Sequence, residues 1–125
     1  KKVTPPRAEP PRELIVFFGF NKSNLTADAQ KVVAEAAAAA TQLNADQVVV
    51  VGHADTVGSP RYNMELSERR AETVKSELVR QGVKSDRIAT SGRGESDLMV
   101  QTGDSVREPQ NRRASITIMI KAATN

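Results

Sequence analysis

The sequence predicts a two-layer α/β sandwich in which helices pack on a sheet of four strands. Three observations lead to this class. Short apolar runs typical of strands alternate with longer segments whose apolar residues recur at helical spacing. The order β-α-β-α-β-(short α)-β favours right-handed crossovers between strands. The 125 residues suffice for one domain with a modest core.

The first half of the chain carries two predicted strands around an alanine-rich helix. Residues 14–18 are a short apolar and aromatic run, which favours a strand. Thr26 suits the N-cap of the following helix, where apolar residues recur from 29 to 43. The four valines at 48–51, which end at Gly52, have the β-branched composition of a central strand.

The second half predicts a long helix, two further strands and a long polar connection. The helix spans about residues 60–81, with Gly82 as its C-terminal stop. Residues 88–91 form a weaker strand, and residues 92–113 a polar connection expected to hold a short helix or to carry function. Residues 115–121 alternate with their isoleucines inward, so one sheet face is expected to be covered and the other less buried.

The positive charge lies mainly in a proline-rich segment at residues 1–13. This segment holds four of the six prolines and a net charge of +2, and we interpret it as a tether. Residues 14–121 form the domain and residues 122–125 a short tail. Outside the tether, fourteen basic groups face thirteen acidic ones, without the basic excess of a nucleic-acid reader. We therefore expect no nucleic-acid partner, and membrane attachment only through an upstream segment.

The composition also excludes several chemistries. Without Cys there is no disulfide scaffold, thiol nucleophile or zinc finger. The single histidine, His53, lies near Asp55 but lacks the converging ligands of a metal site and the positioned nucleophile of a hydrolase. Four aromatic residues leave few rings for stacking on bases or sugars. We therefore expect no enzyme, no metal and no cofactor.

Asp55 and Arg70 are the main candidates for binding chemistry. A rotation of about 100° per residue places Arg70 between Leu66 and Val74 on the apolar arc of its helix, whereas Arg69 lies outside that arc. A buried guanidinium needs a partner. Asp55 follows the valine strand at its carboxyl end, where ligands bind in α/β sheets.

Two interpretations of this pair stay open at the level of the residues. In the first, Asp55 and Arg70 form a structural ion pair, and the domain is a protein-interaction module. In the second, Asp55 binds a ligand cation and Arg70 a ligand carboxylate, which its planar fork can hold bidentately. A zwitterionic amino-acid head group would suit both residues.

Several short motifs occur in a characteristic order. They are Gly52-His53-Ala54-Asp55, Gly58-Ser59, Tyr62-Asn63, Leu66-Ser67, Arg70-Ala71 and Asn111-Arg112-Arg113. With them the chain resembles, over about residues 14–121, the OmpA-like peptidoglycan-binding domain. That domain occurs in outer-membrane porins, the peptidoglycan-associated lipoprotein and flagellar stator proteins.

The resemblance implies non-covalent binding of peptidoglycan through the meso-diaminopimelate of its stem peptide. It assigns the ligand ammonium to Asp55 and the ligand carboxylate to Arg70. It places Asn63, Arg112 and Asn24 around the pocket. The implied location is the periplasm of a Gram-negative envelope, where the domain anchors a parent protein attached to the outer membrane.

The resemblance also implies a mixed sheet with strand order 1-4-2-3. Gly52, His53 and Gly58 are expected to shape the loop that carries Asp55. Two positions depart from the family pattern, because Ala54 replaces a usual threonine and Val57 stands where some relatives carry one. Hydroxyl contacts from these two positions are therefore absent.

Overall fold

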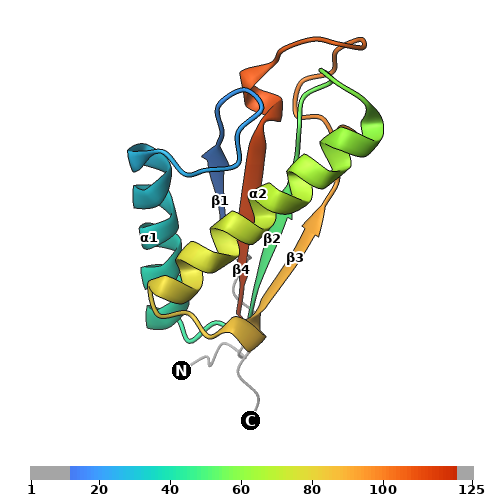
Figure 1. Ribbon diagram of the computed structural model, residues 1–125. Helices are drawn as coiled ribbons and strands as arrows, with labels where there is room; N and C mark the ends of the chain where they lie inside the picture. Colours follow the sequence, from blue (N-terminus) through green and yellow to red (C-terminus); the bar gives the residue numbers. More distant parts are fainter. Residues whose placement is uncertain (1–11, 121–125) are drawn as a thin grey trace, which may run out of the picture.

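Two helices cover one face of a four-stranded mixed sheet (Figure 1). The computed structural model describes residues 12–120. Its elements are β1 (Arg12–Phe17), α1 (Ala27–Gln42), β2 (Gln47–Gly52), α2 (Pro60–Arg80), η1 (Ser85–Arg87), β3 (Ile88–Gly92), η2 (Pro109–Asn111) and β4 (Arg113–Met119). The strand order is β1-β4-β2-β3, which confirms the expected 1-4-2-3 arrangement.

β4 lies between β1 and β2 and is antiparallel to both, whereas β2 and β3 are parallel. The first β-α-β unit therefore does not pair its own two strands. The register pairs Arg12 with Ile118 at one end of the sheet and Phe17 with Arg113 at the other. The described chain begins and ends at the first of these poles, and the loops after β1, β2 and β3 gather at the second (Figure 1).

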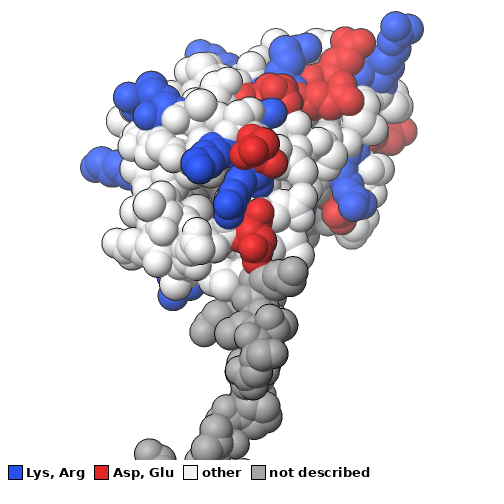
Figure 2. Space-filling view, turned by 90° about the horizontal axis from the view of Figure 1, so that it is seen from below, with Lys and Arg blue, Asp and Glu red and all other residues white. Residues whose placement is uncertain are grey.

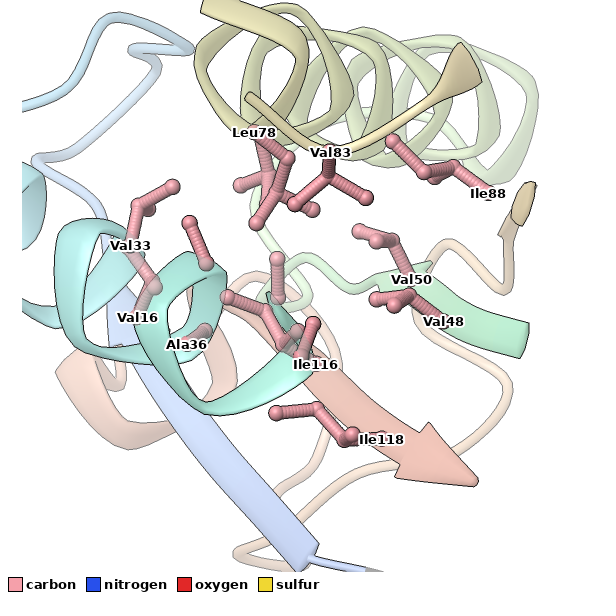
Figure 3. Packing of buried hydrophobic residues seen from close by; sticks show 14 of the residues in the cluster. Val16, Val33, Ala36, Val48, Val50, Leu78, Val83, Ile88, Ile116 and Ile118 are labelled. Atoms are coloured by element: carbon pink, nitrogen blue, oxygen red, sulfur yellow. The ribbon is translucent and has the colours of Figure 1, made fainter. Parts of the chain in front are cut away.

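The core lies between the helices and one face of the sheet (Figure 3). In β4, Ile116 and Ile118 are fully buried while Ser115 and Thr117 are half-buried. This alternation confirms that one sheet face is packed and the other less covered. The packed residues include Val16, Val33, Ala36, Val48, Val50, Val74, Leu78 and Ile88.

Small residues let α2 approach the sheet closely. A Cβ built on Gly52 would lie 1.8 Å from the carbonyl oxygen of Ser67, and one on Gly92 would lie 2.5 Å from the Ser67 hydroxyl. The last residues of β2 and β3 must therefore be glycine for α2 to pack as it does. This contact fixes α2, and the side chains on its first turns, relative to the strand ends.

The helix boundaries agree with their capping signals. The Thr26 hydroxyl accepts from the amide of Ala29, and the Ser59 hydroxyl accepts from the amide of Tyr62. Gly82 has a φ of +108°, the conformation that follows a helix end. The short helix expected in the polar connection is η2, at its C-terminal end.

β1 and β4 both begin two residues earlier than predicted. β1 starts at Arg12, so two residues assigned to the tether belong to the sheet, where they pair with β4. β4 starts at Arg113 and ends at Met119, where 115–121 was expected. Backbone pairing between the two strands extends each beyond its apolar run, because a ladder needs no apolar side chain. The rest of the predicted tether and the tail at 122–125 lie outside the described residues.

Candidate ligand-binding site

The loop pole of the sheet carries a cavity of about 410 Å³. Three segments enclose it: the loop after β1, the loop between β2 and α2, and the first turns of α2. Its lining residues are Phe20, Asn21, Asp55, Val57, Gly58, Tyr62, Asn63 and Leu66. Two predicted site residues, Asp55 and Asn63, are therefore brought together on its wall.

Asp55 is 4% exposed and is held by its own loop and by Arg112, which directly precedes β4. Its Oδ1 accepts from the amide of Val57 at 3.2 Å, an Asx-type contact that fixes the carboxylate. Its Oδ2 lies 3.2 Å from Nη1 of Arg112, so these two groups form an ion pair that is largely shielded from water. Gly58, with φ at +95°, turns the chain from this loop towards α2.

Arg70 is fully buried and donates to three backbone carbonyls. Nε donates to Lys22 at 2.8 Å, Nη1 to His53 at 2.7 Å and Nη2 to Gly19 at 3.2 Å. Its guanidinium also lies over the Phe18 ring, 5.2 Å from the centroid. Arg70 therefore joins the loop after β1 to the end of β2.

These contacts correct the structural interpretation of Asp55 and Arg70. The two side chains form no direct ion pair, because Asp55 pairs with Arg112 and Arg70 with carbonyl oxygens. Asp55 is still close enough to act on Arg70 electrostatically. Burial lowers the pKa of Arg70 to about 10, and the negative charge of Asp55 opposes that shift.

Asn63 lies on the first turns of α2 and is 1% exposed. Its Nδ2 donates to Oε1 of Glu95 at 2.9 Å. Asn24, expected at the pocket, is exposed and is not part of the cavity wall. Asn21 lines the cavity instead, and its Oδ1 accepts from the Tyr62 hydroxyl.

Arg112 connects the site to β1 and to an aromatic ring. Besides Asp55, it donates through Nε to the carbonyl of Phe18 at 3.2 Å. The Phe20 ring lies 6.0 Å from the Arg112 guanidinium and 3.7 Å from that of Arg107. Arg107 comes from the long connection before β4, so this connection borders the cavity.

His53 is buried, and its backbone links neighbouring segments, while the structural role of its side chain stays a prediction. Its amide donates to the carbonyl of Arg113 at 2.7 Å, and its own carbonyl accepts from Arg70. Burial, and then the positive charge of Arg113, lower the pKa of His53 to about 4. The imidazole is therefore neutral at neutral pH.

Besides Asn21, the residues at or beside the site that were missed from the sequence include Phe20, Glu95, Arg107 and Thr56. The Thr56 hydroxyl donates to the carbonyl of Gly103 at 2.7 Å and accepts from the amide of Val106 at 2.9 Å. The scarcity of aromatic residues was a usable signal for Phe20. Glu95 and Arg107 lie in the connection at 92–113, which has no periodicity from which a contact could be inferred.

The residues from 12 to 120 contain no group of three or more His, Cys, Asp or Glu side chains arranged to hold a metal ion. Within the same range, no helix combines the length and the apolar character needed to cross a membrane.

The fold is a small α/β domain with a cavity that carries a shielded carboxylate and has arginines nearby. The chain belongs to the OmpA family, whose profile matches residues 17–112. An outer membrane protein of Gluconacetobacter diazotrophicus is 45% identical over 115 residues, which are 87% of this chain and 30% of that protein. The peptidoglycan-associated lipoprotein of Pasteurella multocida is 36% identical over 99 residues, 79% of this chain and 66% of that protein.

The OmpA-like domain of FopA1 from Francisella tularensis has the same fold. Its TM-score is 0.80 at 27% identity, and the match covers 92% of this chain and 77% of that chain. The chain thus spans under a third of the Gluconacetobacter protein and about two thirds of the lipoprotein.

Proposed function

We propose that this domain binds peptidoglycan non-covalently through the meso-diaminopimelate of the stem peptide. In this role it anchors its parent protein to the cell wall in the periplasm of a Gram-negative envelope. The observation that carries the proposal is Asp55, a shielded carboxylate on a cavity wall, with Arg112 and Arg70 close to it. The similarity to a peptidoglycan-associated lipoprotein supports the choice of polymer.

The site offers separate contacts for the two charges of an amino-acid head group. The ammonium is bound by Asp55, which shares its carboxylate with Arg112. The carboxylate is bound by guanidinium N–H groups. A guanidinium has five N–H donors, and the carbonyl contacts of Arg70 use three of them. Arg112, whose side chain is 13% exposed, is the guanidinium that solvent reaches.

The position of the site suits an anchor. The described chain begins at Arg12, at the pole of the sheet opposite to the cavity. A parent protein joined upstream of Arg12 would therefore lie on the side of the domain away from the cavity, so that the cavity can face the cell wall. The pole opposite to the cavity, seen from below in Figure 2, carries charges of both signs.

Binding to purified sacculi tests the proposal. Asp55→Asn keeps the shape of the side chain and removes its charge, while Asp86→Asn removes an exposed charge in η1 at the opposite pole. We expect Asp55→Asn to lower retention on sacculi by about tenfold or more, since a hydrogen bond to a charged group contributes roughly 1.5–3 kcal/mol.

The Asp86→Asn control is expected to bind as the wild type does. Glycan strands stripped of stem peptides should not be retained. Equal retention of Asp55→Asn and wild type would contradict the proposal, and so would wild-type binding to stripped glycan.

A further inference from the structure

Glu95 contacts Asn63 in the site, although Glu95 lies far from Asn63 in the sequence and in none of the motifs. It accepts a hydrogen bond from Nδ2 of Asn63 at 2.9 Å. The two residues are 32 positions apart, and Asn63 is 1% exposed on the cavity wall. A buried amide that is paired on one side only has a defined orientation.

The backbone before Glu95 is held firmly. The amide of Gly94 donates to the Ser67 hydroxyl at 2.8 Å, and the carbonyl of Gly94 accepts from the amide of Ala54 at 2.8 Å. Gly94 has a φ of +55°, and a Cβ there would lie 3.1 Å from the backbone of Met64. The segment before Glu95 is therefore fixed to both α2 and the Asp55 loop, and it positions Glu95 next to Asn63.

This contact determines which end of the Asn63 amide faces the cavity. A carboxylate only accepts, so the amide must present its NH2 group to Glu95 and its oxygen in the other direction. Oδ1 points towards Gly58, 3.8 Å from where a Cβ of that residue would lie. Within residues 12–120 this oxygen accepts no hydrogen bond, so it is free to accept one from a ligand.

We propose that Glu95 is a positioning residue of the binding site. It holds the Asn63 amide so that its oxygen, together with the Asp55 carboxylate, forms a pair of acceptors for the ligand ammonium. The inference rests on the proposed function, and it deepens it. An ammonium has three N–H donors, so it can bond to both acceptors at once. A flipped Asn63 would instead present an NH2 group and repel the ammonium.

Calorimetric titration with a soluble stem peptide ending in meso-diaminopimelate tests the inference. Glu95→Ala removes the acceptor, and Glu95→Gln keeps an acceptor oxygen without the charge. Glu65→Ala is the matched control, since Glu65 is an exposed acid on α2 whose only ion pair among residues 12–120 is with the exposed Arg61. Asn63→Ala, and its combination with Glu95→Ala, test whether Glu95 acts through Asn63.

We expect Glu95→Ala to raise the Kd about fivefold to tenfold, as for the loss of one ordinary hydrogen bond. Glu95→Gln should stay within about twofold of wild type, because its oxygen can still accept from Asn63. Glu65→Ala should not change the Kd. The double variant should bind no more weakly than Asn63→Ala alone, as for two residues that act through one contact.

Three results would overturn the inference while leaving the proposed function intact, provided that wild type binds and Asp55→Asn does not. They are unchanged binding by Glu95→Ala, a loss by Glu95→Gln as large as that of Glu95→Ala, and additive losses in the double variant. A wild type that fails to bind the peptide would refute the proposed function and this inference with it. Hydrogen exchange of the Asn63 side-chain amide should be slower in wild type than in Glu95→Ala, and equal rates would also count against the inference.

Discussion

Replacing Arg70 with alanine is predicted to destabilise the fold through the loss of three loop contacts. Arg70 is fully buried, and its Nε, Nη1 and Nη2 donate to the carbonyls of Lys22, His53 and Gly19. These carbonyls belong to two loops, the one after β1 and the one between β2 and α2, which no single helix or strand joins. Alanine would remove these three bonds and would open a cavity beneath Phe18. In the described part of the chain, only the Gly19 carbonyl of the three keeps another donor, the amide of Lys22.

The magnitude follows from the number and kind of contacts. Each hydrogen bond from a charged donor contributes roughly 1.5–3 kcal/mol, but contacts of one side chain are not additive. The cost of burying the guanidinium, visible in its lowered pKa of about 10, offsets part of the gain. We expect the free energy of unfolding to fall by about 4 kcal/mol, a large share of the roughly 5–15 kcal/mol typical of a domain. The Tm should then fall by about 15 °C.

Chemical denaturation at pH 7 measures the effect, with Arg69→Ala as the control. Arg69 is the neighbouring arginine on α2 but is exposed, so its replacement should change the free energy of unfolding by less than about 0.5 kcal/mol. A loss below about 1 kcal/mol in Arg70→Ala would refute the role assigned to the carbonyl contacts.

Double-mutant cycles separate this role from a structural ion pair with Asp55. Asp55 pairs with Arg112 at 3.2 Å, so the coupling energy of Asp55 with Arg112 should exceed its coupling with Arg70. The opposite ranking would restore the direct Asp55–Arg70 pair. Because Arg70→Ala perturbs the fold, Asp55→Asn is the better variant for measuring ligand binding.

Three further predictions concern the frame around the site. Gly52→Ala would place a Cβ 1.8 Å from the Ser67 carbonyl oxygen and should lower the free energy of unfolding by about 3 kcal/mol or more. The control is Gly103→Ala at an exposed position, where a Cβ would meet nothing within 4 Å, so its stability should be nearly that of wild type. Equal stabilities of the two variants in denaturant would contradict this prediction. The pKa of His53 is lowered to about 4 in the folded protein. Between pH 6.5 and 4 the unfolded chain therefore binds a proton at His53 that the folded protein does not. The contribution of the neutral imidazole to the free energy of unfolding is complete above pH 6.5 and is lost as the pH falls towards 4. Denaturation of wild type at several pH values should show a pH-dependent part of the free energy of unfolding of up to about 3 kcal/mol, which His53→Gln lacks. If the free energies of unfolding of the two proteins change with pH in parallel, this prediction is wrong. Thr56→Val should lower the free energy of unfolding by about 2 kcal/mol and speed proteolysis at residues 102–106, because it removes hydrogen bonds to Gly103 and Val106. Thr73→Val on α2, whose hydroxyl donates to a carbonyl of its own helix, should lower it little.

The candidate site was predicted from the sequence only in part. Asp55 was predicted from its place at the end of a strand, and Asn63 and Arg112 came from the family motifs; the structure puts all three at or beside one cavity. The partner of Arg70 was misjudged, because a helical wheel shows that a side chain is buried but not what it meets. Glu95 and Arg107 were missed because a polar connection has no repeating pattern.

The sequence alone determined the two long helices with their caps and the valine strand β2. These features depend on interactions within a few residues, such as the Thr26 and Ser59 caps and the run of valines in β2. Only the tertiary structure decided which groups meet at the site. The pairings of Asp55 with Arg112 and of Asn63 with Glu95 join residues 57 and 32 positions apart. Such pairings depend on strand order and on the path of the loops, which local patterns do not encode.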